Sequence, residues 1–248
     1  MTAGTSNYSL KNISNPALTA LIIINAVVFI VLAATSLTSS LEIAEILCLS
    51  SDPTDLIGRP WSLASYSFTQ VNALHLLFNM LWLYSFGRLF AMSQTQLRLI
   101  AVYLIGAIAG GIVFVLFSSI FGSNASGWLM GSSAAVIAVA VTVAMIMPDR
   151  ELNLPLLGPT KIKWIVAVVV VLFCIGLSAP NAGGNLAHLG GAAAGAVYGA
   201  IISRRDKAPE RDNEYGVLVQ KIKCSGYDAL TQREKRRFFE LSSRRNSK

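Results

Sequence analysis

The sequence predicts an all-α fold, that of a polytopic membrane protein with six transmembrane helices. Of its 248 residues, 54% are hydrophobic and 13% are charged, which is about half of the charged fraction that a soluble domain usually carries. The charges are also segregated, so that long apolar stretches are almost free of Asp, Glu, Lys and Arg. Most of these stretches approach the roughly 20 residues that a membrane-spanning helix requires. This composition excludes an ordinary soluble globular domain.

The six predicted spans follow one another along the first 203 residues. They lie at about Ala17–Ala34, Leu74–Met92, Leu99–Phe121, Trp128–Met147, Trp164–Leu177 and Leu186–Ile202. The fifth and sixth are short and could begin earlier along the chain. An alternative interpretation makes the first span a cleavable signal peptide. Its apolar core is long for a signal and its flanking positive charge is only Lys11, so we expect a transmembrane helix.

The distribution of Lys and Arg predicts the orientation of these spans. If both termini are cytoplasmic, the inner segments hold nearly all of the basic residues and the outer loops keep only Arg59. Cytoplasmic segments of membrane proteins are typically rich in Lys and Arg in this way. The sequence therefore predicts a cytoplasmic N-terminal segment at 1–16, a six-helix membrane domain at 17–203 and a basic, cytoplasmic helical tail at 204–248.

The overall charge and the cysteines indicate neither a nucleic-acid partner nor a metal. The net charge of +7 is explained by the orientation and by contact with the lipid bilayer. The three cysteines fall in a loop, a span and the tail, which predicts no metal cluster and no disulfide framework. Within the tail, Thr231 and Glu234 have the spacing of a capping box, so we expect a small helical hairpin there.

Both histidines of the chain, His75 and His188, lie in predicted spans. Ionisable residues at membrane depth usually face a cavity or a polar partner. His75 belongs to "HLLFN", in which Asn79 is four residues later and therefore on the same face of a helix. The pair could donate hydrogen bonds to an anion that develops on a substrate oxygen. Alternatively, it could bridge two helices.

The second histidine, His188, precedes two glycines on the same side of the sixth span, Gly191 and Gly195. Small residues at this spacing let a neighbouring helix approach closely. We expect that neighbour to be the alanine-rich fourth span, which begins on the same outer side with "GSSAA". A serine at that helix start lies beside free backbone N–H groups, and His188 could deprotonate it. Because all 13 acidic residues lie outside the spans, the sequence predicts a Ser–His dyad without an Asp.

Three motifs in order on the second, fourth and sixth spans resemble the rhomboid family of intramembrane serine proteases. The resemblance covers about residues 15–203. The motifs are "HLLFNMLW" with His75 and Asn79, "GSSA" with Gly131 and Ser133, and "NLAHLGGAAAG" with His188, Gly191 and Gly195. The resemblance implies a protease that cuts transmembrane segments of other membrane proteins near the outer membrane face, without a metal or cofactor. The tail resembles one found in some Bacteroidetes rhomboids, which implies a bacterial inner membrane.

The resemblance also implies roles for individual residues. Ser133 would be the nucleophile and His188 the base, while His75, Asn79 and the Ser133 backbone amide would line the oxyanion hole. The glycines at 131, 191 and 195 are expected to serve helix packing. The G-x-S spacing favours Ser133 over Ser132 as the attacking residue.

The sequence departs from the family pattern at three positions near these motifs. The glycine that follows the nucleophile in the family is Ala134 here. The aromatic residue four positions after the serine, which packs on the catalytic histidine in the family, is Ile137. A histidine common before the second span is Gln70. None of the three replaces a residue to which the resemblance assigns a catalytic role.

Two other functions remain open at this point. One is a rhomboid-like protein that lacks protease activity and binds membrane clients, which the intact serine, histidines and asparagine disfavour. The other is a transporter, which should show inverted repeats and broken helices around a midplane site, whereas the polar groups here lie at the outer ends of spans. The oligomeric state is not indicated.

The fifth span, "WIVAVVVVLF", has no small-residue stripe, so we expect it to be the least tightly held helix and the gate for substrates.

Overall fold

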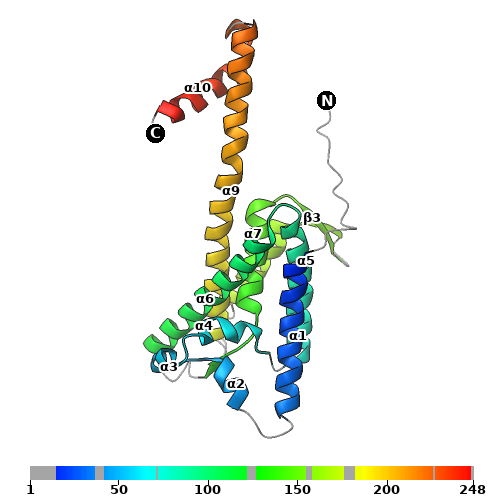
Figure 1. The fold of residues 1–248 in the computed structure, drawn as a ribbon, viewed down its shortest axis with the longest axis vertical. Coiled ribbons are helices and arrows are strands. Elements are labelled where there is room, and N and C mark those ends of the chain that lie inside the picture. Colours follow the sequence, from blue (N-terminus) through cyan, green and yellow to red (C-terminus); the bar gives the residue numbers. More distant parts are fainter. Residues whose placement is uncertain are drawn as a thin grey trace. The chain divides into compact units, whose positions relative to one another are not determined.

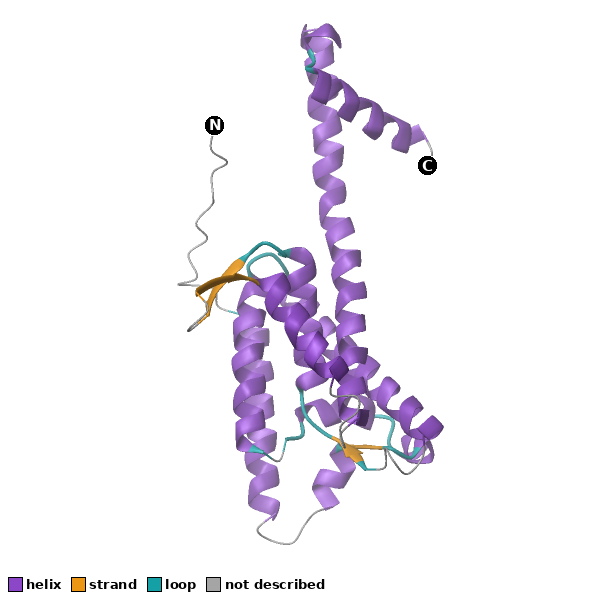
Figure 2. Ribbon diagram, turned by 180° about the vertical axis from the view of Figure 1, so that it is seen from behind, coloured by secondary structure: helices purple, strands orange, loops and turns teal. Residues whose placement is uncertain are grey.

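The computed structural model of the protein describes residues 15–36, 42–70, 72–121, 127–154, 158–175, 182–225 and 227–246. These residues form mainly helices, with two short two-stranded sheets (Figures 1 and 2). The chain divides into two compact units, Met1–Gly199 and Ala200–Lys248, which are described separately. The predicted all-α membrane class is confirmed.

The long helices of the first unit follow the predicted spans in order (Figure 1). They are α1 (Pro16–Ser36), α5 (Ala73–Ala91), α6 (Gln96–Phe121), α7 (Ser133–Ile146), α8 (Ile162–Ile175) and the first part of α9 (Ala182–Ser225). Three segments are long and apolar enough to cross a membrane, namely Pro16–Thr35, Gln96–Phe121 and Gly183–Arg205, while α7 and α8 are shorter apolar helices. A total of six spans therefore stays a prediction.

The connection between α1 and α5 is folded against the other helices. It contains the short elements α2 (Glu42–Leu47), β1 (Leu49–Ser50), α3 (Pro53–Gly58), α4 (Ser62–Ser65) and the 3-10 helix η2 (Tyr66–Phe68). The hydroxyl of Tyr66, which is buried, donates a hydrogen bond of 2.7 Å to the carbonyl of Ala107 in α6. Strand β1 pairs antiparallel with β2 (Trp128–Leu129), just before α7. This connection therefore supports the chain where α7 begins.

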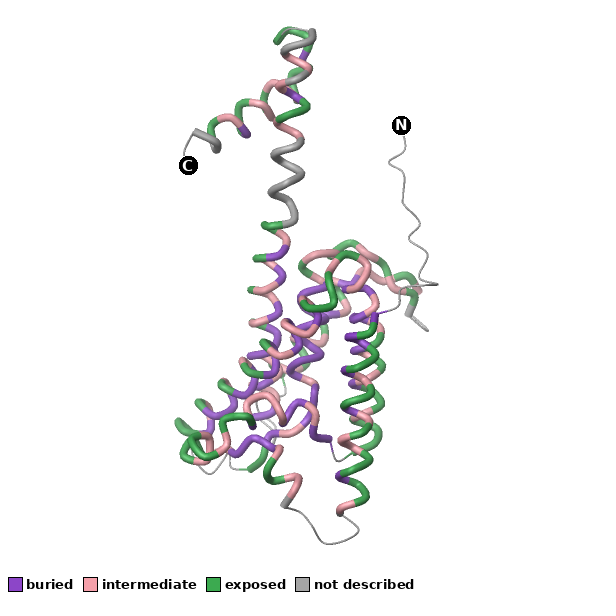
Figure 3. Tube along the Cα trace, viewed as in Figure 1, coloured by how far each residue is buried: buried purple, intermediate pink, exposed green. Residues whose placement is uncertain are grey.

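Helix α7 lies at the centre of the first unit. Every residue from Ala134 to Val143 is buried, and the neighbouring helices pack around them (Figure 3). On α6, a Cβ added at Gly106 would collide with the methyl group of Ala138, so the two helices approach closely because this position has no side chain. Apolar side chains on the outer faces of α1, α5 and α6 are exposed, as expected for helices that face lipid.

A short hairpin joins α7 to α8. Strands β3 (Glu151–Leu154) and β4 (Gly158–Lys161) pair antiparallel (Figure 2). Just before the hairpin, the carboxylate of Asp149 lies 2.8 Å from the Lys163 ammonium and 3.3 Å from that of Lys161. Hydrogen bonds from these two lysines hold the pKa of Asp149 below its usual range. The hairpin was not foreseen from the sequence.

The second unit is a small helical hairpin, as expected. The C-terminal part of α9 is followed by the 3-10 helix η5 (Tyr227–Ala229) and by α10 (Gln232–Asn246). Leu218, Leu230 and Leu241 form its small core. At the start of α10, Thr231 and Glu234 exchange backbone-to-side-chain hydrogen bonds of 2.8 and 3.3 Å, which confirms the capping box. Hydrogen bonds from Lys221 and Thr231 lower the pKa of Glu234 to about 2.

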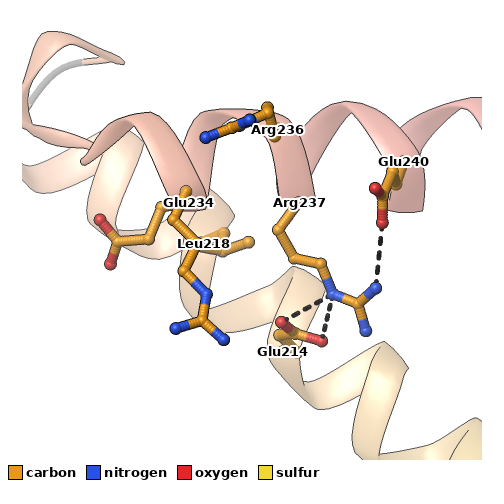
Figure 4. A pocket seen from close by; sticks show the side chains of 7 residues that line it. Glu214, Leu218, Glu234, Arg236, Arg237 and Glu240 are labelled. Atoms are coloured by element: carbon orange, nitrogen blue, oxygen red, sulfur yellow. Dashed lines mark hydrogen bonds and ion pairs between the residues drawn. The ribbon is translucent and has the colours of Figure 1, made fainter.

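Ion pairs join the two helices of this hairpin across an open pocket of about 660 Å³. The Arg237 guanidinium, on α10, lies 3.0 Å from Glu214 on α9 and 3.1 Å from Glu240 on α10 (Figure 4). The pocket is lined almost entirely by charged side chains. Exposed pairs of this kind each contribute little to stability, so the three leucines of the core are expected to contribute most of it.

Candidate active site

The turn that leads into α7 depends on a glycine. Gly131 has a φ of +114°, which residues with a Cβ rarely adopt. Its N–H donates a hydrogen bond of 3.0 Å to the Tyr66 carbonyl, and a Cβ at this position would lie 2.9 Å from Cε1 of His75. Gly131 lies in a turn outside the helices, so its expected role in helix packing stays a prediction. It shapes the turn and leaves room for the His75 ring.

The two neighbouring serines after this turn have different partners. Ser133, the first residue of α7, places its Oγ 2.6 Å from Nε2 of His188. Ser132 is fully buried, and its Oγ accepts a hydrogen bond of 3.2 Å from Nε2 of Gln70. Of these two serine hydroxyls, only that of Ser133 has an imidazole within hydrogen-bond distance in the contacts of the described residues.

The close approach of α9 to α7 brings His188 to Ser133. A Cβ added at Gly191 would collide with the carbonyl of Ala134, and one at Gly195 would collide with the backbone of Ala138. One turn further along α7, the hydroxyl of Thr142 donates a hydrogen bond of 2.9 Å to the Gly195 carbonyl. Because the obstructing atoms are backbone, any side chain at these two glycines would push the helices, and with them the dyad, apart.

Ala134, at the position after Ser133 where the resemblance predicts a glycine, is accommodated by α6. Ala134 is buried, and a Cβ built at Gly110 would lie 2.7 Å from its methyl group. The absence of a side chain at Gly110 therefore leaves space for the extra methyl group. Ala134 does not disturb the start of α7, since its backbone still forms the contact with Gly191.

A cavity of about 270 Å³ opens onto the two residues of the dyad. Its lining comes from four helices and is mostly apolar, with a few polar groups, as is usual for a ligand site. The lining residues are His75, Phe78, Asn79, Trp82, Ser133, Val136, Ile137, Val169, Phe173 and His188. The structure thus brings together all four residues that were predicted to take part in chemistry.

Asn79 is held by a buried network that the sequence did not predict. Its Nδ2 donates a hydrogen bond of 3.1 Å to Oε1 of Gln70. Nε2 of Gln70 donates to Oδ1 of Asn25 at 3.0 Å, as well as to Ser132. Nδ2 of Asn25 in turn donates to the Tyr103 hydroxyl at 3.2 Å. The signal was available, since Asn25 is a lone amide in the first apolar span and Gln70 precedes the second.

Several hydrogen-bond donors surround the space next to Ser133. The first turn of a helix leaves its backbone N–H groups without helical partners, and in α7 the first helical bond is donated by Val136, to Ser132 at 2.9 Å. The N–H groups of residues 133–135 therefore precede the first helical bond, at the end of α7 that carries Ser133. His75 and Asn79 line the same cavity. Such a group of donors could stabilise an oxyanion.

An aromatic ring from α8 covers the face of His188. The ring centroids of Phe173 and His188 are 4.2 Å apart, with an angle of 42° between the planes. The residue at position 137, where the resemblance predicts an aromatic, is Ile, and the contact of Phe173 with the histidine was not foreseen from the sequence. No periodicity within one helix could have revealed this contact, because it joins two helices.

The described ranges contain no group of three or more His, Cys, Asp or Glu side chains that could hold a metal ion. The geometry instead offers an alcohol next to an imidazole, with hydrogen-bond donors nearby. An alcohol placed in this way could act as a nucleophile, with the imidazole as its general base.

Comparison with known proteins agrees with this geometry. The model of the Rhomboid domain family matches residues 58–205, which include every residue of the candidate site. The chain is also similar to the rhomboid protease GluP of Bacillus subtilis (strain 168), with 26% identity over 145 residues. The match covers 58% of this chain and 26% of that relative, so it spans about a quarter of the relative's length.

Proposed function

The chain belongs to the rhomboid family, and from this premise we propose that it is an intramembrane serine protease with a Ser133–His188 dyad. Rhomboid membership and the apolar helices make it an integral membrane protein of a protease family. The observation that carries the proposal is the distance of 2.6 Å between Ser133 Oγ and His188 Nε2. At this distance the imidazole can take the hydroxyl proton while the oxygen attacks a peptide carbonyl.

The proposed reaction has two halves. In the first, Ser133 Oγ forms a bond to the carbonyl carbon as its proton moves to Nε2 of His188, and the imidazolium then gives this proton to the departing amine. In the second, a water molecule gives a proton to Nε2 and attacks the acyl group, and the proton returns to Ser133 as the acid product leaves. For Nε2 to accept the first proton, the neutral imidazole must carry its hydrogen on Nδ1.

The negative charge that forms on the carbonyl oxygen requires donors placed in advance. We assign this role to the first-turn N–H groups of α7, His75 and Asn79. The network through Gln70 supports the assignment, because it uses one N–H of the Asn79 amide and so limits its rotation. The second N–H of that amide remains available for the oxyanion.

We further propose that the substrates are transmembrane segments of other membrane proteins, cut near the outer face of a bacterial inner membrane, with both termini of the enzyme cytoplasmic. The charge asymmetry of the sequence supports this orientation. A substrate helix hides its carbonyls, so Gly or Pro near the cut should favour cleavage by weakening the helix. A client-binding protein without activity would not require a serine hydroxyl within hydrogen-bond distance of an imidazole.

The test is cleavage of a model transmembrane substrate by the purified full chain in proteoliposomes, together with labelling by a fluorophosphonate. We expect the wild-type chain to cleave the substrate and to be labelled. Ser133→Ala should do neither, whereas Ser119→Ala, on α6 and not among the residues that line the cavity, should behave like wild type. Equal labelling of Ser133→Ala and wild type, or a folded wild type that neither cleaves nor is labelled, would contradict the proposal.

A further inference from the structure

Few protein groups hold the imidazole of His188 in place. Its Nε2 contacts Ser133 at 2.6 Å, while Nδ1 is buried and has no hydrogen-bond partner among the residues that the structure describes. In a Ser–His–Asp triad a carboxylate on the second nitrogen orients the ring. With a single hydrogen bond, the ring can tilt about the Oγ–Nε2 direction. The plane of the imidazole must therefore be set by packing.

The packing partner is Phe173. Its ring lies 4.2 Å from the imidazole, centroid to centroid, and it lines the same cavity. Phe173 lies on the same face of α8 as the buried Val166 and the half-buried Val169, because the three residues are spaced three and four positions apart. Its neighbour Leu172 points outward and is 58% exposed. The contact with His188 therefore belongs to the side of α8 that faces the site.

The helix that carries the nucleophile supplies no aromatic ring for this purpose. Ile137 lies one turn after Ser133 on the same face of α7, and it too lines the cavity. It is aliphatic, so the aromatic contact of His188 comes from a different helix. On the basis of the proposed function, we propose that Phe173 is a positioning residue that sets the orientation of the His188 imidazole.

This assignment links the dyad to the placement of α8. Within α8, all of whose residues are described, only Ile162 and Val166 are buried, and both lie in the first half of the helix. Phe173 lies near the other end. A displacement of that end, such as the admission of a substrate between helices would require, removes the ring from the imidazole. Hydrolysis then proceeds once α8 has returned, so the site is fully assembled only when it is closed.

The size of the effect follows from the strength of ring contacts. A contact between two rings changes an equilibrium by about two- to tenfold, and a misplaced catalytic group costs up to about 100-fold in rate. We therefore expect Phe173→Leu, which keeps an apolar side chain but removes the ring, to lower kcat about tenfold and to change KM less than twofold. Phe173→Tyr should keep kcat within about twofold of wild type.

The experiment measures kcat and KM of the full chain in proteoliposomes for these variants, with Leu172→Ala as the matched control on the outer face of α8. A second arm adds Ile137→Tyr to Phe173→Leu, which places a ring beside His188 from α7 instead. We expect this double variant to regain at least half of the lost kcat on a logarithmic scale. Leu172→Ala should match wild type.

Three outcomes would overturn the assignment: an unchanged kcat in Phe173→Leu, a change confined to KM, or a loss of kcat that Ile137→Tyr does not restore. The first two would make Phe173 part of the wall of the cavity only. Failure of the proposed function is distinguishable, because it would appear as absent cleavage by the wild-type chain. If Phe173→Leu does not fold, Phe173→Met, which is also apolar and lacks a ring, replaces it in both arms with the same expected outcomes.

Discussion

The α7–α9 pair and helix α8 border the same cavity, but they are held in the molecule in different ways. Between α7 and α9 the backbones are in direct contact at Gly191 and Gly195, and Thr142 adds a hydrogen bond between the helices. Helix α8 has two buried residues, and Val168, Val171 and Leu172 are each more than half exposed. Ser133 and His188, the proposed nucleophile and base, thus lie on the tightly packed pair, while the aromatic ring that covers His188 lies on the loosely packed helix.

This difference teaches how one site can combine precise chemistry with access for a large substrate. A distance such as that between Ser133 and His188 must be kept within a fraction of an ångström, and close backbone packing achieves this. The transmembrane substrates proposed above would have to enter from the side, which would require a helix that can move at low cost. This division between a tightly packed pair and a loosely packed helix can be tested by substitution and cross-linking, taken from the largest expected effect to the smallest.

Removal of the Ser133 hydroxyl should have the largest effect. We expect Ser133→Ala to lower kcat/KM by at least about 1,000-fold, because the nucleophile is lost. Ser132→Ala should lose far less, since the buried Ser132 hydroxyl is hydrogen-bonded to Gln70 and is not the one that contacts His188. Cleavage assays on both variants decide the matter. The assignment is wrong if Ser132→Ala is the inactive variant and Ser133→Ala keeps near-normal activity.

Loss of a donor next to the dyad should have the second largest effect. His75→Ala and Asn79→Ala should each lower kcat by about 100- to 1,000-fold, the usual result of removing one oxyanion donor, with KM and folding nearly unchanged. Gln70→Leu should reproduce part of the Asn79→Ala defect, because it removes the acceptor of the Asn79 amide. Unchanged turnover in both alanine variants would return His75 and Asn79 to a packing role.

A side chain between α7 and α9 should affect stability and activity together. Gly191→Ala places a methyl group against the Ala134 carbonyl, so we expect a loss of about 1–3 kcal/mol in the free energy of unfolding and slower cleavage. The matched control is Gly216→Ala in the second unit, where nothing lies within 4 Å of the added Cβ. That variant should be as stable as wild type or slightly more stable. Thermal unfolding in detergent measures both, and equal stability of the two variants would contradict tight α7–α9 packing.

Restraint of α8 should have the smallest effect, confined to large substrates. In a variant without native cysteines, a cross-link between Trp82→Cys on α5 and Val169→Cys on α8, which line the same cavity, should slow the cleavage of transmembrane substrates about tenfold or more. Labelling of Ser133 by a small fluorophosphonate should be much less affected, because that reagent needs no lateral opening. The uncross-linked double cysteine variant is the control. Normal cleavage of transmembrane substrates by the cross-linked enzyme would show that α8 is not the gate.

The sequence by itself determined the class of the protein and the order of its candidate site residues along the chain. Apolar stretches of membrane-spanning length can be recognised from local composition alone. The lipid bilayer requires every spanning segment to be apolar and to satisfy its own backbone hydrogen bonds, whatever the rest of the fold. A histidine in an apolar span is costly enough to indicate a function, and this placed His75 and His188 among the candidates. The close pairing of two helices was also readable, because the glycine spacing on one matches the small residues of the other.

The tertiary structure alone decided which groups meet across different helices. Gly131 adopts a positive backbone angle and leaves room for the nearby His75 ring, and neither feature follows from its G-x-S spacing to Ser133. The buried links between Asn25, Gln70 and Asn79 join segments that are far apart in the sequence. The contact of Phe173 with His188 likewise depends on the rotation of α8 about its own axis. Periodicity specifies which residues share one face of a helix, but only the packed structure determines what that face meets.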